Sequence, residues 1–255
     1  MVRAVFHLSL RATQGFLESV VALLGVDLPV PDYTTISRRQ TGLKLQLGQL
    51  HGSGPRHVVI DTTGLKVFGA GEWYVRKHGM ARGRRRIWRK LHLGVDETTK
   101  EIVAVDLTSS SVHDSRHMPA LLDRIDDEVR QVSGDRAYDS GPCYQAILQR
   151  RAIPTIPPRR NARLSTAKDP PAYRLERDAV VCRIKKEGRY AWRTASGATR
   201  QSLAENAVSR FKAVVGVKLA ARAFENQQVE ALVKCRVLNR MASLGMPVSE
   251  RVLQG

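Results

Sequence analysis

The sequence predicts an α/β protein in which helices flank a mixed sheet and a small helical segment precedes it. Two observations lead to this class. Runs of β-branched residues, bounded by acidic or glycine-containing turns, follow one another before the middle of the chain, whereas apolar residues near its end recur at helical spacing. The predicted order is three strands, a helix, a strand, a helix, a strand and a late helix. The 255 residues, 42% of them hydrophobic, suffice to bury one full core.

The first 50 residues are expected to form two helices. Apolar side chains recur at helical spacing over residues 8–24, and a stretch with glycine and proline then breaks the pattern. Thr34 or Thr35 is expected to cap a second helix over residues 36–47. A basic second helix suggests docking on DNA, and a solvated helical face explains the same residues about as well. The arginines concerned are Arg38 and Arg39.

The sheet is expected to begin after the linker "HGSGPR", where the periodicity changes from helical to extended. Three strands are predicted within residues 57–68, 89–96 and 101–109, joined as an antiparallel meander. A helix from about Asp114, a short strand before "GDRAYDS", a helix through "CYQAILQRR" and a strand at "AIPTIP" follow.

The second half of the chain contains a stretch without clear periodicity. Residues 157–199 are rich in proline and arginine, and we expect a basic, irregular connection there. The helical pattern returns at Ser202, and a last helix is expected to end at Gly245. The chain is thus expected to divide into a helical segment, residues 1–50, and a main domain, residues 55–245.

The charge balance points to a polyanionic partner. Lys and Arg number 42 against 24 Asp and Glu, a net charge of +18, so nucleic acid is the first candidate, although ribosomal, membrane-surface and polyphosphate-binding proteins share such a balance. The run "ARGRRRIWRK" is spaced for phosphate contacts, with a solvated charged loop as the alternative. Its candidate contacts are Arg84, Arg85, Arg86, Arg89 and Lys90.

Compartment and redox state follow from what the sequence lacks. No apolar run approaches the roughly 20 residues that a membrane span requires, and no secretory signal is recognisable, so the cytoplasm is the expected location. The three cysteines form no CxxC pair, which favours reduced thiols over a disulfide framework or a zinc site.

Two acids are placed at predicted strand ends and a third lies on the late helix. Asp61 follows a β-branched run, Asp135 follows the fourth strand, and Glu205 begins the helical pattern. Carboxylates with no nearby His or Cys favour Mg²⁺ or Mn²⁺, and two such ions about 3.5–4 Å apart support in-line displacement at phosphorus. Turn formation explains either Asp alone, and "SLAE" also fits a capping box with Ser202 as N-cap.

At these residues the sequence resembles the bacterial insertion-sequence DDE transposases, whose catalytic domain has an RNase H-like fold with a five-stranded mixed sheet. The resemblance rests on "DYTTISRR", "VVIDTTGLKV", "RRRIWRKLHLGVD", "HDSRHMPALL", "GDRAYD" and "SLAENAVSRFK", in family order. It implies that Asp61, Asp135 and Glu205 hold Mg²⁺ while the protein cuts element ends and joins the freed 3′ hydroxyls to target DNA. It also implies a nucleoid-associated bacterial protein.

The resemblance also implies a Tyr, Arg, Glu, Lys signature around the third acid. Glu205 and Lys212 occupy their places, whereas Ala198 and Gln201 stand where the family has Tyr and Arg, and the adjacent Arg200 is a substitute candidate. Lys212 lies two helical turns, ~10 Å, beyond Glu205, suited to gripping a phosphate or pairing with a carboxylate.

Three activities remain open at this stage. The first is a transposase, which would synapse two element ends and is therefore expected to act as a homodimer on DNA. The second is a catalytically impaired remnant that only binds DNA, a reading favoured by the missing Tyr and Arg and by an expected truncation before the first helix. The third is a metal-dependent endonuclease that cuts without joining.

Overall fold

The computed structural model describes residues 1–41, 43, 47, 54–67 and 88–245. Its centre is a six-stranded sheet of order β3-β2-β1-β4-β5, with β6 paired to β1. The first three strands form the predicted antiparallel meander, and β4, β5 and β6 join in parallel. The strands are β1 Arg56–Val67, β2 Trp88–Asp96, β3 Ile102–Ser109, β4 Val129–Ser133, β5 Ile153–Thr155 and β6 Lys218–Leu219.

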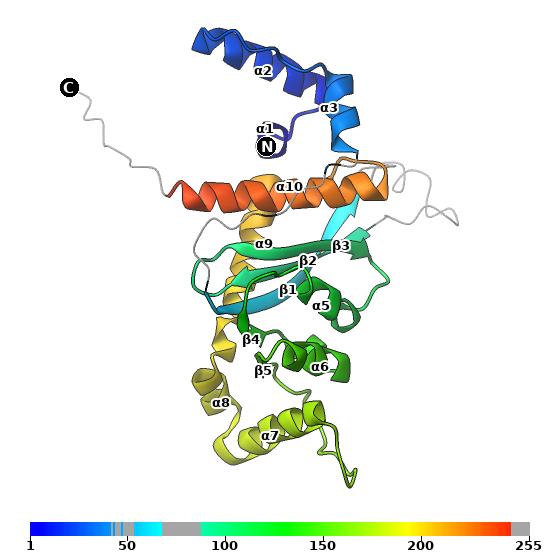
Figure 1. Ribbon diagram of the computed structural model, residues 1–255, viewed down its shortest axis with the longest axis vertical. Helices are drawn as coiled ribbons and strands as arrows, with labels where there is room; N and C mark the ends of the chain where they lie inside the picture. Colours follow the sequence, from blue (N-terminus) through cyan, green and yellow to red (C-terminus); the bar gives the residue numbers. More distant parts are fainter. Residues whose placement is uncertain (42, 44–46, 48–53, 68–87, 246–255) are drawn as a thin grey trace, which may run out of the picture.

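This mixed sheet is the RNase H-like arrangement, and its five principal strands confirm the fold class. The two-residue β6 is an addition that the sequence pattern did not predict. None of the described helices is long and apolar enough to cross a membrane. The principal helices are α1 Val2–Val5, α2 Leu10–Leu24, α3 Tyr33–Gln40, α5 Asp114–Leu122, α6 Gly141–Gln149, α7 Ala172–Glu187, α8 Arg189–Ser196, α9 Ser202–Val215 and α10 Phe224–Ser243 (Figure 1).

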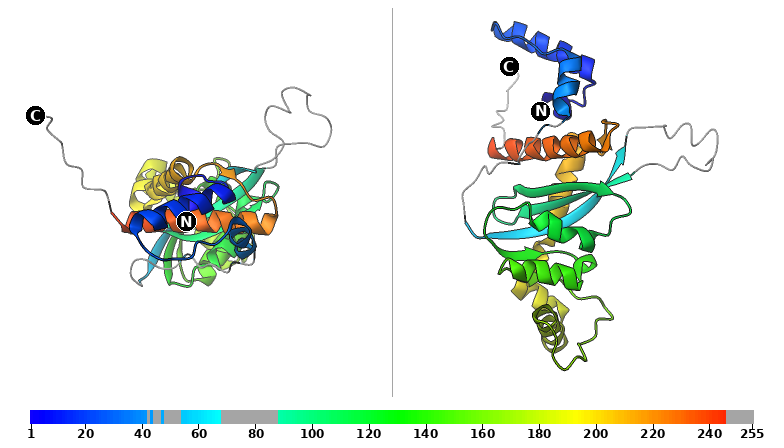
Figure 2. Two further views of the ribbon diagram at one scale, coloured as in Figure 1. Left: turned by 90° about the horizontal axis from the view of Figure 1, so that it is seen from above. Right: turned by 45° about the vertical axis from the view of Figure 1, so that its right-hand side comes forward.

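Two apolar clusters cover the two faces of the sheet. Alternate residues of β1 point to opposite faces, so Val59 and Leu65 pack with α9 and α10 while Val58 and Ile60 pack with α5 and α6. The predicted "VVI" run is thus buried on both sides. Helices α2 and α3 lie beyond α10 at one end of the molecule, and α7 and α8 lie at the other end (Figures 1 and 2).

The N-terminal segment contains the two predicted helices with different limits. The second helix starts at Tyr33, and Asp32 caps it by accepting from the backbone N–H groups of Thr34 and Thr35 at 2.7 and 2.9 Å. The predicted threonine cap is therefore wrong, because a carboxylate with two oxygens also accepts from both threonine hydroxyls. The helix ends at Gln40 rather than at the predicted residue 47, while residues 42, 44–46 and 48–50 lie outside the described part of the chain.

The expectation of an irregular connection over residues 157–199 is correct for residues 157–171, which form no helix or strand, and wrong for the part that follows. The stretch contains two helices, α7 and α8, and a φ of +87° at Gly188 allows the turn between them. Helix α7 buries only Val181 and α8 only Trp192, so neither helix carries the apolar stripe that would reveal it in the sequence.

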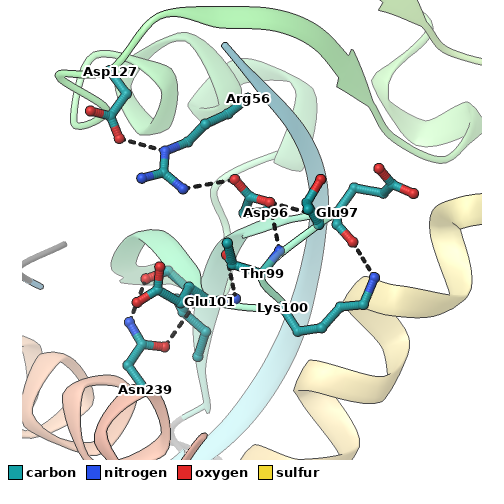
Figure 3. Close-up of polar contacts among 10 residues, drawn as sticks. Arg56, Asp96, Glu97, Thr99, Lys100, Glu101, Asp127 and Asn239 are labelled. Carbon is teal, nitrogen blue, oxygen red and sulfur yellow. Dashed lines mark hydrogen bonds and ion pairs between the residues drawn. The ribbon is translucent and has the colours of Figure 1, made fainter. Parts of the chain in front are cut away.

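Polar side chains fix the ends of the sheet to their surroundings (Figure 3). Buried Asn239 on α10 donates to the Ile102 carbonyl at 2.8 Å and accepts from the Ile102 N–H at 2.9 Å, which anchors α10 to the start of β3. Buried Arg56, the first residue of β1, donates to Asp96 at 2.7 Å and to Asp127 at 2.5 Å. Because these contacts join the start of β1 to β2 and to the turn before β4, they hold the central strands in register.

Candidate active site

The parallel pairing of β1 and β4 brings the first two acids to one level of the sheet. Val59 pairs with Ser133, and Asp61 and Asp135 each follow by two residues. Strand β1 continues to Val67, so the prediction that Asp61 ends the first strand is wrong. Asp61 instead lies where the pairing with β4 ends, beside the loop that carries Asp135.

Helix α9 presents Glu205 toward the same part of β1. The Gln201 side chain, just before α9, donates to the carbonyl of Ile60 at 3.1 Å. Buried Ala204 and Ala207 then pack into the cluster that contains Val59. By strand alternation Asp61 faces the same side as Val59, the side that α9 covers. Glu205 is exposed in the first turn of this helix.

The pKa of Asp61 is affected by the charges of nearby acids. Burial raises the pKa of Asp61 to about 6, the N–H of Thr62 opposes this rise, and the charges of Asp135, Glu205 and Asp114 add to it. Three segments distant in sequence therefore act on one carboxylate. Asp114 is paired with Lys90 at 2.9 Å, which leaves Asp135 and Glu205 as the acids available to share a ligand with Asp61.

Carboxylate oxygens are suitable ligands for a hard divalent cation, but the three carboxylates do not surround one point in this structure. Among the described residues, no group of three His, Cys, Asp or Glu side chains lies close enough to hold a metal ion. One oxygen of Asp135 accepts from the Ala137 N–H at 2.8 Å. All three acids would offer oxygen ligands of the type that Mg²⁺ and Mn²⁺ prefer, provided that the side chains close on the cation.

The capping-box interpretation of "SLAE" is wrong. The preceding 3-10 turn, Ala198–Gln201, leads directly into α9, so Ser202 has helical backbone angles and its hydroxyl points to the Thr199 carbonyl at 3.5 Å. Within the described part of the chain, Glu205 has no hydrogen-bond or ion-pair partner. Its carboxylate is therefore available for a ligand.

A buried hydrogen-bond chain that sequence reasoning missed supports the two aspartates. The Tyr138 hydroxyl lies 2.9 Å from the Thr62 hydroxyl, which lies 3.1 Å from Nδ1 of His92. Burial lowers the pKa of His92 to about 4, so the ring is neutral and its Nε2 bonds Thr108 at 2.8 Å. Since Thr62 follows Asp61 and Tyr138 belongs to the Asp135 loop, this chain links the segments that carry both acids.

The motif "GDRAYD" explains the shape of the Asp135 loop. A Cβ on Gly134 would lie 2.8 Å from the Tyr138 ring, so only glycine allows this ring to fold back against the loop. Asp139, whose side chain is fully buried, accepts from the Arg177 guanidinium at 2.8 and 3.2 Å and from the Arg159 N–H at 2.9 Å. The close succession of Asp135, Tyr138 and Asp139 in the sequence was the signal that this loop is special. Nothing in the sequence indicated that Arg177 is the partner of Asp139.

Some of the cations predicted to bind DNA are held by contacts within the fold, whereas others are exposed. Arg89 donates to Gln227 at 2.8 Å and stacks over Phe224, and Lys90 donates to the Val112 carbonyl as well as to Asp114. These contacts occupy both side chains within the fold. Arg38 and Arg39 are exposed on α3, and Arg84, Arg85 and Arg86 lie outside the described residues.

Some residues near Glu205 are exposed without a partner, and others are held by contacts within the fold. Lys212 is exposed two turns along α9 and, among the described residues, has no carboxylate partner. Arg200 pairs with Glu97 at 3.1 Å. Gln201 is held by the Ile60 carbonyl, and Ala198 is buried. Asp135 and Glu205 therefore lie near enough for their charges to act on Asp61, although the three acids do not surround one point, and Lys212 lies on the same helix as Glu205. Arg200 and Gln201 are engaged in contacts within the fold.

Replacing Asp61 is expected to stabilise the protein in metal-free buffer. The folded-state pKa of Asp61 is about 6 against 3.8 for an ordinary Asp, so Asp61→Asn should raise the free energy of unfolding by about 1–3 kcal/mol above pH 6. As pH falls from 6 to 4, the folded state takes up a proton before the unfolded state does, and the gain disappears. Urea unfolding of the parent protein and of Asp61→Asn at pH 8 and pH 4.5 measures this gain. Equal free energies of unfolding for the two proteins at pH 8 would contradict the prediction.

The chain thus has an RNase H-like sheet with one acid in β1, a second in the loop after the adjacent β4 and a third on the helix α9 that packs on the sheet. The family model of the transposase DDE domain matches residues 52–240, and a second model of the same description matches residues 1–70. The chain therefore belongs to the DDE transposase family.

Two solved structures were compared with the chain. The piggyBac transposase in a synaptic complex with hairpin DNA has a TM-score of 0.41 and 12% identity over 75% of this chain, which spans 47% of the length of that chain. The Mos1 transposase in a pre-cleavage transpososome has a TM-score of 0.25 and 10% identity, covering 95% of this chain and 80% of that one.

Proposed function

We propose that this protein cleaves the ends of an insertion-sequence element and joins the freed 3′ hydroxyls to target DNA, with Asp61, Asp135 and Glu205 holding Mg²⁺ or Mn²⁺. The observation that carries the proposal is the electrostatic convergence of the three acids. Burial and the charges of Asp135 and Glu205 raise the pKa of Asp61, a cost that a divalent cation would offset. Membership of the transposase family supports the same reading.

The side chains would divide the work between the cations and the DNA. Once bound, two such cations would supply activation of the attacking oxygen and stabilisation of the leaving oxygen. Asp61 and Asp135 would fix the reacting phosphate relative to the sheet, because Thr62 and Tyr138 hold their two segments together. Lys212, ~10 Å along α9 from Glu205, would grip a neighbouring phosphate. Two copies of the chain would hold the two ends of an element.

One feature favours the alternative of a remnant that binds DNA without joining it. The positions where the family has Tyr and Arg hold Ala198 and Gln201, and Gln201 is committed to the Ile60 carbonyl. A neutral amide offers no charge to a DNA strand end. Lys212 and the three acids, which are present, weigh against the alternative.

A joining assay separates the activities. The protein is incubated with labelled terminal-repeat DNA, target plasmid and Mg²⁺, in parallel with Asp135→Asn. Joined product that disappears in the variant is the expected result. Cutting without joining supports an endonuclease, and binding with neither product supports the remnant. Joining that is undiminished in Asp135→Asn would remove this acid from the site.

A further inference from the structure

The helical arm at one end of the molecule, residues 172–196, carries positive charge that the fold does not use. The arm consists of α7, Gly188 and α8, and it lies at the opposite end of the molecule from α2 and α3 (Figures 1 and 2). It holds seven Lys and Arg residues against three Asp and Glu. Two of these acids are paired within the arm, Glu187 with Arg183 at 3.0 Å and Asp178 with Arg177 at 3.7 Å.

Three exposed cations of the arm have no side-chain partner within the described part of the chain. Lys185 and Lys186 lie in the last turn of α7, and Arg193 lies in the last turn of α8. Tyr190, three residues before Arg193, is 83% exposed. On a helix, residues three apart lie on one face, so Tyr190 and Arg193 are on the same face of α8. An exposed aromatic ring among cations is the combination that binds a nucleic-acid strand by stacking and phosphate contact.

The arm is joined firmly to the segment that carries the second acid. Asp139, four residues after Asp135, is fully buried and receives two hydrogen bonds from Arg177 in the middle of α7. A Cβ on Gly141 would lie 3.0 Å from the ring of Tyr173, so the start of α7 also packs closely on α6. DNA held by the arm would therefore have a fixed position relative to Asp135.

We propose that this arm is a DNA-docking surface, in which Lys186 and Arg193 contact phosphates and Tyr190 stacks on an unpaired base of the same DNA. The inference rests on the proposed function in that the ligand is DNA. It adds a contact surface that neither the charge run of residues 81–90 nor the signature around Glu205 supplies. Arg89 and Lys90 of that run are occupied within the fold, which leaves the arm as a source of free positive charge.

The salt dependence of DNA binding tests the phosphate contacts. The full chain, in metal-free buffer, is titrated with a blunt duplex at several salt concentrations, alongside the double variant Lys186→Gln and Arg193→Gln. Each phosphate contact adds about 0.9 to the slope of log K against log salt, so the arm variant should lose about 2 from that slope. The matched control replaces two exposed residues with Gln, namely Arg222, which precedes α10, and Arg240, which lies in the last turn of α10. It should keep the slope of the parent protein.

The ring has its own test. Tyr190→Ala should weaken binding to a duplex with a single-stranded 3′ overhang by about 5- to 100-fold and leave binding to the blunt duplex unchanged. Thermal unfolding checks that each variant is folded. Equal slopes for the arm variant and the control, or equal loss on both DNAs for Tyr190→Ala, would overturn the inference while leaving the proposed function intact. A protein that binds neither DNA would overturn both.

Discussion

Glu205→Gln is expected to slow strand joining by about 10³-fold or more while binding of terminal-repeat DNA stays within about 2-fold. The acid is exposed, has no partner among the described residues, and contributes to the raised pKa of Asp61. Replacing it with a neutral amide would remove one anionic ligand from the proposed metal site, where a bound cation would contribute several kcal/mol of transition-state stabilisation. Its contribution to the fold is small, because it lies in the first turn of α9 without a capping contact. Single-turnover joining rates and gel-shift affinities measure the two effects.

Glu225→Gln is the matched control. Glu225 is likewise exposed in the first turn of a helix, α10, but stands apart from the three acids. It should keep the joining rate of the parent protein. A Glu205→Gln protein that joins DNA as fast as the Glu225→Gln control would show that the third acid has no part in the chemistry.

Arg56→Met is expected to lower the free energy of unfolding by about 3–5 kcal/mol. Arg56 is 4% exposed and donates to two carboxylates, of which Asp96 also accepts from the backbone N–H groups of Thr98 and Thr99 (Figure 3). Removing the guanidinium leaves two carboxylates, one buried and one nearly so, without their cation, and that loss costs far more than an ion pair at the surface. Urea unfolding at pH 7 measures the effect.

The ion pair of Arg124 with Asp106 supplies the comparison. The guanidinium of Arg124 lies 2.8 Å from the carboxylate of Asp106, close to the 2.7 Å between Arg56 and Asp96. The Arg124 side chain, however, is 52% exposed. Arg124→Gln should therefore cost less than about 1 kcal/mol. If both variants lost the same stability, the buried position of Arg56 would not be what makes its ion pairs matter.

Local signals in the sequence located the five principal strands of the sheet, but not the two-residue β6. β-Branched residues and short turns located the first three strands and their antiparallel meander. The parallel register of β1 and β4, which sets Asp61 level with Asp135, comes from the structure. Glu205 was found through the resemblance of "SLAENAVSRFK", since a single acid on a helix carries no chemical signal of its own.

The capping box and the irregular connection over residues 172–199 were predicted wrongly for one physical reason, namely contacts between residues that are distant in sequence. The capping box failed because a 3-10 turn precedes α9, and that turn is anchored by Gln201 on Ile60 of β1. Helix α7 was missed because its anchor is an ion pair between Arg177 and Asp139 rather than an apolar stripe. Neither partner is adjacent in sequence, so no local pattern could predict these contacts.

Divalent-cation binding to the protein without DNA is the measurement closest to the central claim. Titration with Mn²⁺, followed by the paramagnetic signal of the free ion, should show a site whose affinity falls at least 10-fold in each of Asp61→Asn, Asp135→Asn and Glu205→Gln, but not in Glu225→Gln. Unchanged Mn²⁺ affinity in the three acid variants would mean that these carboxylates do not form one metal site, and the assignment of the active site would be wrong.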